Sequence, residues 1–139
     1  MKDKKISFLL VEDDEVDIMN VKRAFERNKI SNPLHIARDG IDALEMLKRK
    51  PRIENYPNVI LLDLRMPKMD GIEFLKNVRA DSELKKLIII VLTTSDDDKD
   101  IVSAYDFNVA GYIVKPITFD KFLQAMATIN LYWTLSKLP

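Results

Sequence analysis

Five short apolar runs, separated by longer segments with helical spacing, constrain the fold of this chain more than any other feature. The runs are rich in Val, Ile and Leu, and they predict strands over Ile6–Val11, Leu34–Ala37, Val59–Leu62, Leu87–Leu92 and Tyr112–Val114. Their hydrophobicity is continuous rather than alternating, which is typical of strands covered on both faces in a parallel sheet. The segments between them carry apolar residues at helical spacing, namely Ile41, Leu44 and Leu47, then Ile72, Leu75 and Val78, and finally Phe119, Phe122, Leu123 and Met126. Strand and helix thus alternate, which predicts an α/β fold: a doubly wound parallel sheet with helices on both faces.

Length and composition limit the classes of function. A chain of 139 residues suits one domain, which we expect over residues 1–128, with residues 129–139 extending the last helix. Lys plus Arg and Asp plus Glu number 22 each, so no broad basic field favours nucleic acid or an anionic membrane. The absence of Cys excludes disulfides and thiolate chemistry. The first apolar run is too short for a signal core or a membrane span, so we expect a cytoplasmic protein.

Polar residues gather where the predicted strands end. Ligands of parallel α/β sheets bind beyond the carboxyl ends of the strands, so these positions are the candidate site. They are Glu12, Asp13, Asp14, Asp63, Thr93, Thr94, Ser95 and the Lys115-Pro116 pair. Taken singly, most of these residues have an ordinary structural explanation, because acidic residues before a helix often cap it and a Lys-Pro pair often makes a turn; that explanation weakens when all the strand ends are considered together. Asp63 is harder to explain in this way, because a carboxylate that ends a buried apolar run must be desolvated, paired or metal-bound.

The residue types at the strand ends favour one chemistry. Carboxylate oxygens without His or Cys suit Mg²⁺ or the similar Mn²⁺, and a divalent cation would relieve the repulsion between crowded carboxylates. Asp accepts phosphoryl groups covalently, while a metal ion, a Lys and a hydroxyl stabilise phosphoryl oxygens during transfer. The pattern therefore predicts phosphoryl transfer to Asp63.

At these residues the chain resembles the receiver domains of two-component response regulators. The matching segments are Val11-Glu12-Asp13-Asp14, Leu62-Asp63-Leu64-Arg65-Met66-Pro67-Lys68-Met69-Asp70-Gly71, Leu92-Thr93-Thr94 and Gly111-Tyr112-Ile113-Val114-Lys115-Pro116. They occur in the family's order over roughly residues 5–128, and the separations of Asp63, Thr93 and Lys115 agree with those of the family. Two departures are small: Glu12 stands where Asp is commoner, and the loop over residues 48–58 is a few residues longer.

The resemblance implies a flavodoxin-like sheet in the order 2-1-3-4-5 and a role for each site residue. Asp63 would be the phosphoacceptor. The metal site would comprise Asp13, Asp63, the backbone carbonyl of Arg65 and, through water, Glu12. Phosphoryl binding and switching would involve Thr93, Thr94, Lys115 and Tyr112. The implied function is that of a stand-alone response regulator, which takes its phosphoryl group from a sensor histidine kinase and signals through a changed contact with a downstream protein or phosphotransfer domain.

The C-terminal segment resembles the tail of single-domain regulators paired with phytochrome kinases. Apolar residues from Ile129 to Leu138 span most of a helix circumference at about 100° per residue, so they cannot all face one core. We therefore expect a homodimer with Ile129, Tyr132, Trp133 and Leu135 at its interface. Two alternatives stay open: the extra apolar residues cover the protein's own core, or this surface binds the kinase and the isolated protein is a monomer.

Other classes of function are less consistent with the sequence. Phosphotransferases of the haloacid-dehalogenase kind carry a second Asp two positions after the nucleophile, where this chain has Arg65. A degenerate receiver would lack one of the expected groups, and all of them are present. The three glycines form neither of the common nucleotide-binding motifs.

Overall fold

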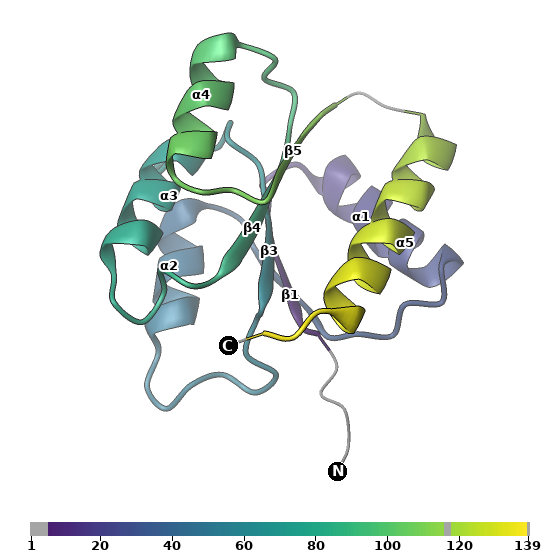
Figure 1. The fold of residues 1–139 in the computed structure, drawn as a ribbon, viewed down its shortest axis with the longest axis horizontal. Helices are drawn as coiled ribbons and strands as arrows, with labels where there is room; N and C mark the ends of the chain where they lie inside the picture. Colours follow the sequence, from purple (N-terminus) through teal and green to yellow (C-terminus); the bar gives the residue numbers. More distant parts are fainter. Residues whose placement is uncertain (1–5, 116–117, 139) are drawn as a thin grey trace.

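Five parallel strands form a single sheet in the order β2-β1-β3-β4-β5 in the computed structural model, which describes residues 6–115 and 118–138 (Figure 1). The strands are β1 (Phe8–Val11), β2 (Leu34–Ala37), β3 (Val59–Leu62), β4 (Ile88–Thr93) and β5 (Gly111–Val114). The helices are α1 (Glu15–Arg27), α2 (Gly40–Lys48), α3 (Gly71–Ala80), α4 (Asp98–Asp106) and α5 (Phe119–Leu135). The predicted fold class and strand order are confirmed.

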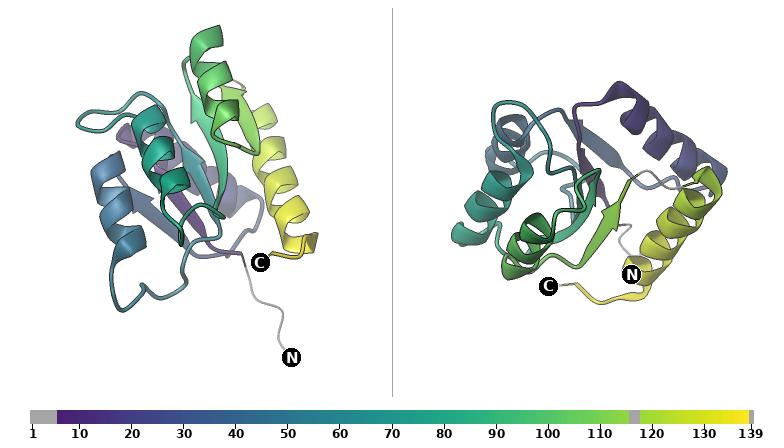
Figure 2. Two further views of the ribbon diagram at one scale, coloured as in Figure 1. Left: turned by 60° about the vertical axis from the view of Figure 1, so that its left-hand side comes forward. Right: turned by 90° about the horizontal axis from the view of Figure 1, so that it is seen from above.

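Helices cover both faces of the sheet, as Figure 2 shows from above: α1 and α5 lie on one face, and α2, α3 and α4 lie on the other. Alternate residues of each strand enter separate cores, so Leu9 and Val11 pack on the side of α2 and α3, whereas Phe8 and Leu10 pack on the side of α1 and α5. Both sets are almost fully buried. Burial on both faces explains why the strands read as continuous apolar runs.

The register brings the carboxyl ends of the central strands to one edge of the sheet. Val11 at the end of β1 lies opposite Ala37 of β2 and Leu62 of β3. The first strand begins at Phe8 rather than at Ile6, and the fourth spans residues 88–93 rather than 87–92. Thr93 is therefore the last residue of β4, while Asp63 and Lys115 directly follow their strands.

Every helix begins at a side-chain cap. The caps are Asp14, Asp39, Asp70, Asp97 and Thr118, each of which accepts a hydrogen bond from a backbone N–H in the first turn. Thr118 caps α5, and Asp97, within the acidic run at residues 96–98, caps α4. The two Asp-Gly pairs that would ordinarily signal turns are instead helix starts, because the Asp satisfies N–H groups that the first turn leaves unpaired.

Gly71, the first residue of α3, is required by close packing. A Cβ at this position would lie 2.6 Å from the Cα of Leu64 and 2.7 Å from the carbonyl oxygen of Asp63. The Gly71 N–H donates a 3.0 Å hydrogen bond to the Leu64 carbonyl. The start of α3 therefore lies directly against the backbone that follows β3.

The last helix is long, but it ends earlier than expected. α5 stops at Leu135, and the Ser136 N–H closes it with a hydrogen bond to the Tyr132 carbonyl. The expectation that residues 129–139 extend the last helix is confirmed for residues 129–135 and wrong for residues 136–138, where the chain leaves the helix and Leu138 packs against the core on the side of α1 and α5. Pro139 and the proline of the predicted Lys115-Pro116 turn lie outside the described residues. None of the helices in the described part of the chain has the length and hydrophobicity that crossing a membrane requires.

Candidate functional site

Three carboxylates meet at the carboxyl edge of the sheet. Glu12 and Asp13 follow β1, Asp63 follows β3, and one carboxylate oxygen from each lies within 4.8 Å of the others. Glu12 and Asp63 are buried, whereas Asp13 is exposed. The Asp63 N–H donates to the Val11 carbonyl and the Glu12 N–H to the Ala37 carbonyl, each at 3.0 Å. These bonds continue the sheet ladder past the strand ends and fix the backbone of both acids.

Glu12 has the most perturbed carboxyl group of the cluster. Burial raises its pKa from 4.5 to about 7; the nearby charge of Asp63 adds to this effect, and the contact with Lys115 partly opposes it. A bound cation would stabilise the ionised form of Glu12, which burial disfavours, so this carboxyl group suits a cation-binding site. Three hard oxygen donors within reach of one another match the ligands that Mg²⁺ and Mn²⁺ prefer, so the residues present fit such an ion.

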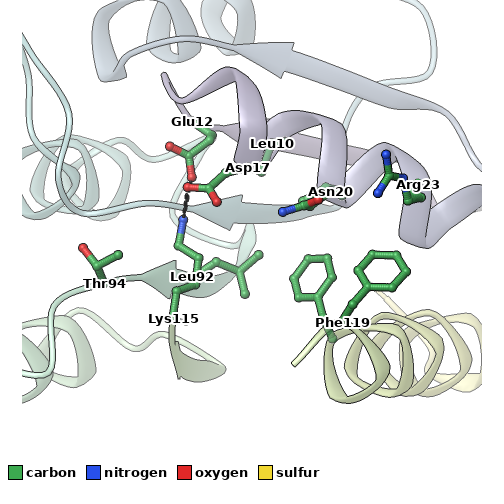
Figure 3. Close-up of a pocket in the computed structure, with 11 residues that line it drawn as sticks. Leu10, Glu12, Asp17, Asn20, Arg23, Leu92, Thr94, Lys115 and Phe119 are labelled. Atoms are coloured by element: carbon green, nitrogen blue, oxygen red, sulfur yellow. Dashed lines mark hydrogen bonds and ion pairs between the residues drawn. The ribbon is translucent and has the colours of Figure 1, made fainter. Parts of the chain in front are cut away.

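Lys115 provides the positive charge beside this cluster. Its ammonium lies 2.8 Å from Glu12 Oε1 and 2.8 Å from Asp17 Oδ2. Figure 3 shows the Lys115 side chain pointing toward both carboxylates. Burial would lower the pKa of Lys115, but its hydrogen bonds to Asp17 and Glu12 outweigh burial and raise the pKa above its usual value. The ammonium therefore stays charged at neutral pH. Asp17 comes from the first turn of α1 and is not one of the predicted site residues.

The two predicted hydroxyl residues differ in their surroundings. Thr93 is fully buried, and its Oγ1 accepts a 3.3 Å hydrogen bond from the Ser95 N–H. Thr94 is exposed and, with Lys115, lines a cavity of about 340 Å³ between α1 and α5. Thr93 therefore holds the loop after β4, whereas Thr94 faces the space around the ammonium.

Tyr112 connects β5 to the same loop. Its hydroxyl donates a 2.8 Å hydrogen bond to the Ser95 carbonyl, and burial raises the pKa of its phenol. The Ser95 hydroxyl in turn donates to Asp100 at 2.6 Å. Tyr112 is thus attached to a loop rather than free in solvent.

Arg65 contributes more than the backbone carbonyl predicted for it. Its N–H donates to Asp63 Oδ1 at 3.2 Å, and its guanidinium lies 2.8 Å from Asp100 Oδ2. The side chain therefore joins the loop after β3 to the first turn of α4. Asp100 is not one of the predicted site residues, because its contact with Arg65 spans 35 residues and has no local signal in the sequence.

Among curated proteins, the chain is similar to two regulators. It is 37% identical over 126 residues to the probable methanogenesis regulatory protein FilR2 of Methanothrix harundinacea, a match that covers 90% of this chain and 81% of that protein. It is 35% identical over 127 residues to the response regulator Rcp1 of Synechocystis, with 90% and 86% covered.

Solved structures agree with this relationship. The phosphorylated cyanobacterial phytochrome response regulator RcpA superposes with a TM-score of 0.85 at 32% identity, over 98% of this chain and 99% of that one. The Mn²⁺-bound form of Rcp1 gives a TM-score of 0.82 at 33% identity with the same coverage. The model of the response regulator receiver domain matches residues 8–127, which include every strand, the carboxylate cluster and Lys115. The chain therefore belongs to the family of response regulator receiver domains.

Proposed function

We propose that this protein is a stand-alone, cytoplasmic response regulator that accepts a phosphoryl group on Asp63 from the phosphohistidine of a sensor histidine kinase. The observation that carries the proposal is the cluster of Glu12, Asp13 and Asp63 beside the Lys115 ammonium. An oxygen of Asp63 forms the new bond to phosphorus as the bond from phosphorus to the histidine nitrogen breaks, and the histidine leaves with that electron pair.

The remaining site residues would have two roles, metal binding and phosphoryl binding. Asp13, Asp63 and the Arg65 carbonyl would hold Mg²⁺ or Mn²⁺ directly, with Glu12 acting through water; when bound, the ion neutralises the carboxylates that repel an incoming phosphoryl group. Lys115 and Thr93 would stabilise the phosphoryl oxygens, with Thr94 at the rim of the site. The similar regulator Rcp1 has a Mn²⁺-bound form, which supports a divalent ion as the cofactor of this protein.

The proposal places this protein in signalling rather than in metabolism. A receiver domain is not a conventional enzyme, so the haloacid-dehalogenase alternative is set aside. The phosphorylated state would be read by a downstream protein or a phosphotransfer domain through contacts that change with Thr93 and Tyr112.

The acceptor can be tested by intact mass spectrometry after incubation with acetyl phosphate and Mg²⁺. We expect the wild type to gain one phosphoryl group and Asp63→Asn to gain none. Asp96→Asn, which alters an exposed Asp in the loop after β4, is the matched control and should label like the wild type. Undiminished labelling of Asp63→Asn would show that another residue is the acceptor.

A phytochrome-type kinase is the partner we propose, because the chain is similar to RcpA and to the bacteriophytochrome response regulator RtBRR along almost its whole length. Phosphotransfer from a panel of autophosphorylated histidine kinases tests this choice. The phytochrome-type member should transfer fastest at equal concentration. Faster transfer from a kinase of another class would refute it.

We also propose a homodimer through the C-terminal part of α5. The side chains of Tyr132 and Leu135 are exposed, whereas Ile129 and Trp133 are partly buried against the protein's own core. Ile129, Tyr132 and Trp133 line an apolar hollow of about 370 Å³ between α5 and β5. Exposed apolar residues beside such a hollow favour a second copy, although two of the four predicted residues are shared with the core of the monomer.

A further inference from the structure

The ammonium of Lys115 is divided between two carboxylates, and only one of them belongs to the predicted metal cluster. Glu12 is a member of the cluster, whereas Asp17 lies on α1, outside it. Both carboxylates lie 2.8 Å from Nζ, so they hold the ammonium equally closely (Figure 3). Within the described residues, Lys115 makes no ion pair with Asp63 at or below 4.0 Å. The cation that would stabilise the phosphoryl group therefore lies toward α1 in this structure.

The backbone of Asp17 is fixed, but its side chain is not enclosed. Its N–H donates to the cap Asp14 at 3.1 Å, which places it in the first turn of α1. Its side chain is 32% exposed, compared with 3% for Glu12. Releasing Glu12 from the ammonium would leave a buried carboxylate without its partner, whereas Asp17 can be hydrated when it is released.

The cavity between α1 and α5 provides the space for this release. It is lined by both Asp17 and Lys115 and has a volume of about 340 Å³, enough for the freed carboxylate and several waters. An incoming phosphoryl group can therefore take the ammonium from Asp17 without disturbing the buried contact with Glu12.

We infer that Asp17 is a positioning residue that holds Lys115 on the α1 side of the site in the unphosphorylated protein and competes with the phosphoryl group for its ammonium. The inference rests on the proposed function, since it requires phosphorylation of Asp63. Asp17 slows phosphorylation because Lys115 must break its ion pair with Asp17 before its ammonium can stabilise the phosphoryl oxygens, and breaking that pair offsets part of the stabilisation.

The test is the rate at which acetyl phosphate labels Asp63, followed by intact mass at fixed Mg²⁺. Asp17→Asn should label about two- to fivefold faster, the factor that corresponds to losing a partly exposed ion pair. Asp17→Ala should behave in the same way, and a melting curve confirms that each variant is folded. Glu15→Gln removes an equal charge from the same turn, where Glu15 pairs with Arg38 instead, and should label at the wild-type rate.

A double-mutant cycle separates this role from a general charge effect. In a Lys115→Ala background, Asp17→Asn should leave the slower rate unchanged, because its effect passes through the ammonium. Unchanged or slower labelling by Asp17→Asn in the wild-type background would overturn the inference, and so would equal acceleration in Glu15→Gln or in the Lys115→Ala background. An absence of labelling at Asp63 in the wild type would instead overturn the proposed function.

Discussion

The hydroxyl of Tyr112 and the Oγ1 of Thr93 hold the same residue, Ser95, from its two ends. Tyr112 donates to the Ser95 carbonyl at 2.8 Å, and Thr93 accepts from the Ser95 N–H at 3.3 Å. If Thr93 turns toward a phosphoryl group, the Ser95 N–H loses its partner, and the loop that retains Tyr112 becomes free to shift. This shared residue gives a physical route from the site to β5.

We therefore predict that Thr93→Ala accepts a phosphoryl group with little further change at Tyr112, because the variant has already lost the acceptor of the Ser95 N–H. The measurement is ¹⁹F NMR of protein labelled with fluorotyrosine, with the Tyr112 signal assigned through Tyr112→Phe. Phosphorylation should move the Tyr112 signal in the wild type but shift it far less in Thr93→Ala, even though both proteins gain the same mass. Equal shifts in the two proteins would contradict the coupling.

Tyr112→Phe should itself lower the free energy of unfolding by about 1 kcal/mol, because it removes a hydrogen bond and leaves the Ser95 carbonyl without that donor. Urea denaturation measures the change. Tyr105→Phe is the matched control, since the Tyr105 side chain is half exposed, and it should unfold like the wild type. The assigned role of the Tyr112 hydroxyl would be wrong if both variants lost the same stability.

The raised pKa of Glu12 predicts a pH dependence with a definite sign. A carboxyl whose pKa is about 7 in the folded protein and 4.5 as a free group binds its proton more tightly when folded. Its contribution to stability is therefore present below about pH 4.5 and is lost as the pH rises through about 7. Glu12→Gln cannot titrate, so its stability relative to the wild type should rise over this range by on the order of 2–3 kcal/mol. Urea denaturation at pH 5, 6, 7 and 8 in a chelator tests this, and a constant difference would refute it.

Metal binding should stabilise the unphosphorylated protein. A ligand present at a hundredfold excess over its Kd adds about 2.7 kcal/mol when it binds only the folded state. Asp13→Asn removes an exposed carboxylate of the proposed metal site and should weaken the gain with Mg²⁺, whereas Asp42→Asn, on an exposed face of α2, should retain it. The midpoint of thermal unfolding with and without Mg²⁺ is the measurement. Identical shifts in wild type and Asp13→Asn would count against the metal site.

If the dimer forms through α5, exposed apolar residues on α5 should be needed for dimerisation, whereas an exposed apolar residue on α2 should not. Tyr132→Ser combined with Leu135→Ser should convert a dimer into a monomer, because both side chains are exposed near the end of α5 and Tyr132 lines the hollow between α5 and β5. Ile41→Ser removes an exposed apolar residue from the opposite face of the sheet and should leave the dimer intact. Sedimentation velocity at tens of micromolar measures the outcome. A wild-type monomer, both phosphorylated and unphosphorylated, would exclude the dimer.

The fold was predictable because its strands are buried on both faces. Leu9 and Leu10 enter different cores, and such neighbours make each strand a continuous apolar run, which is typical of a strand in a covered parallel sheet. Once the strands are located, their carboxyl ends are located as well, and the parallel sheet brings Glu12, Asp13 and Asp63 together at those ends. Helix ends were less predictable: Leu138 continues the apolar pattern of α5 yet lies beyond its last turn, because an apolar residue reaches the core from either conformation.

The contacts that sequence reasoning missed are between side chains distant in the chain. Asp17 pairs with Lys115 across 98 residues, and Arg65 pairs with Asp100 across 35. Asp17 lies in the first turn of α1 but Asp13 lies before the cap Asp14, so helical spacing gave no signal that Asp17 approaches the site. Lys115 reaches the first turn of α1 because β5 lies in the same sheet as β1, and this arrangement cannot be read from the sequence around either residue.

The contact between Glu12 and Lys115 joins residues 103 positions apart, near opposite ends of the domain. The three acidic residues are synthesised well before the lysine, so a chain emerging from the ribosome carries the repelling carboxylates without their counter-ion. Only when β5 adds to the edge of the sheet does the ammonium arrive, because Lys115 directly follows that strand. The complete arrangement of charges in the site thus forms only after nearly the whole domain has been synthesised and β5 has joined the sheet.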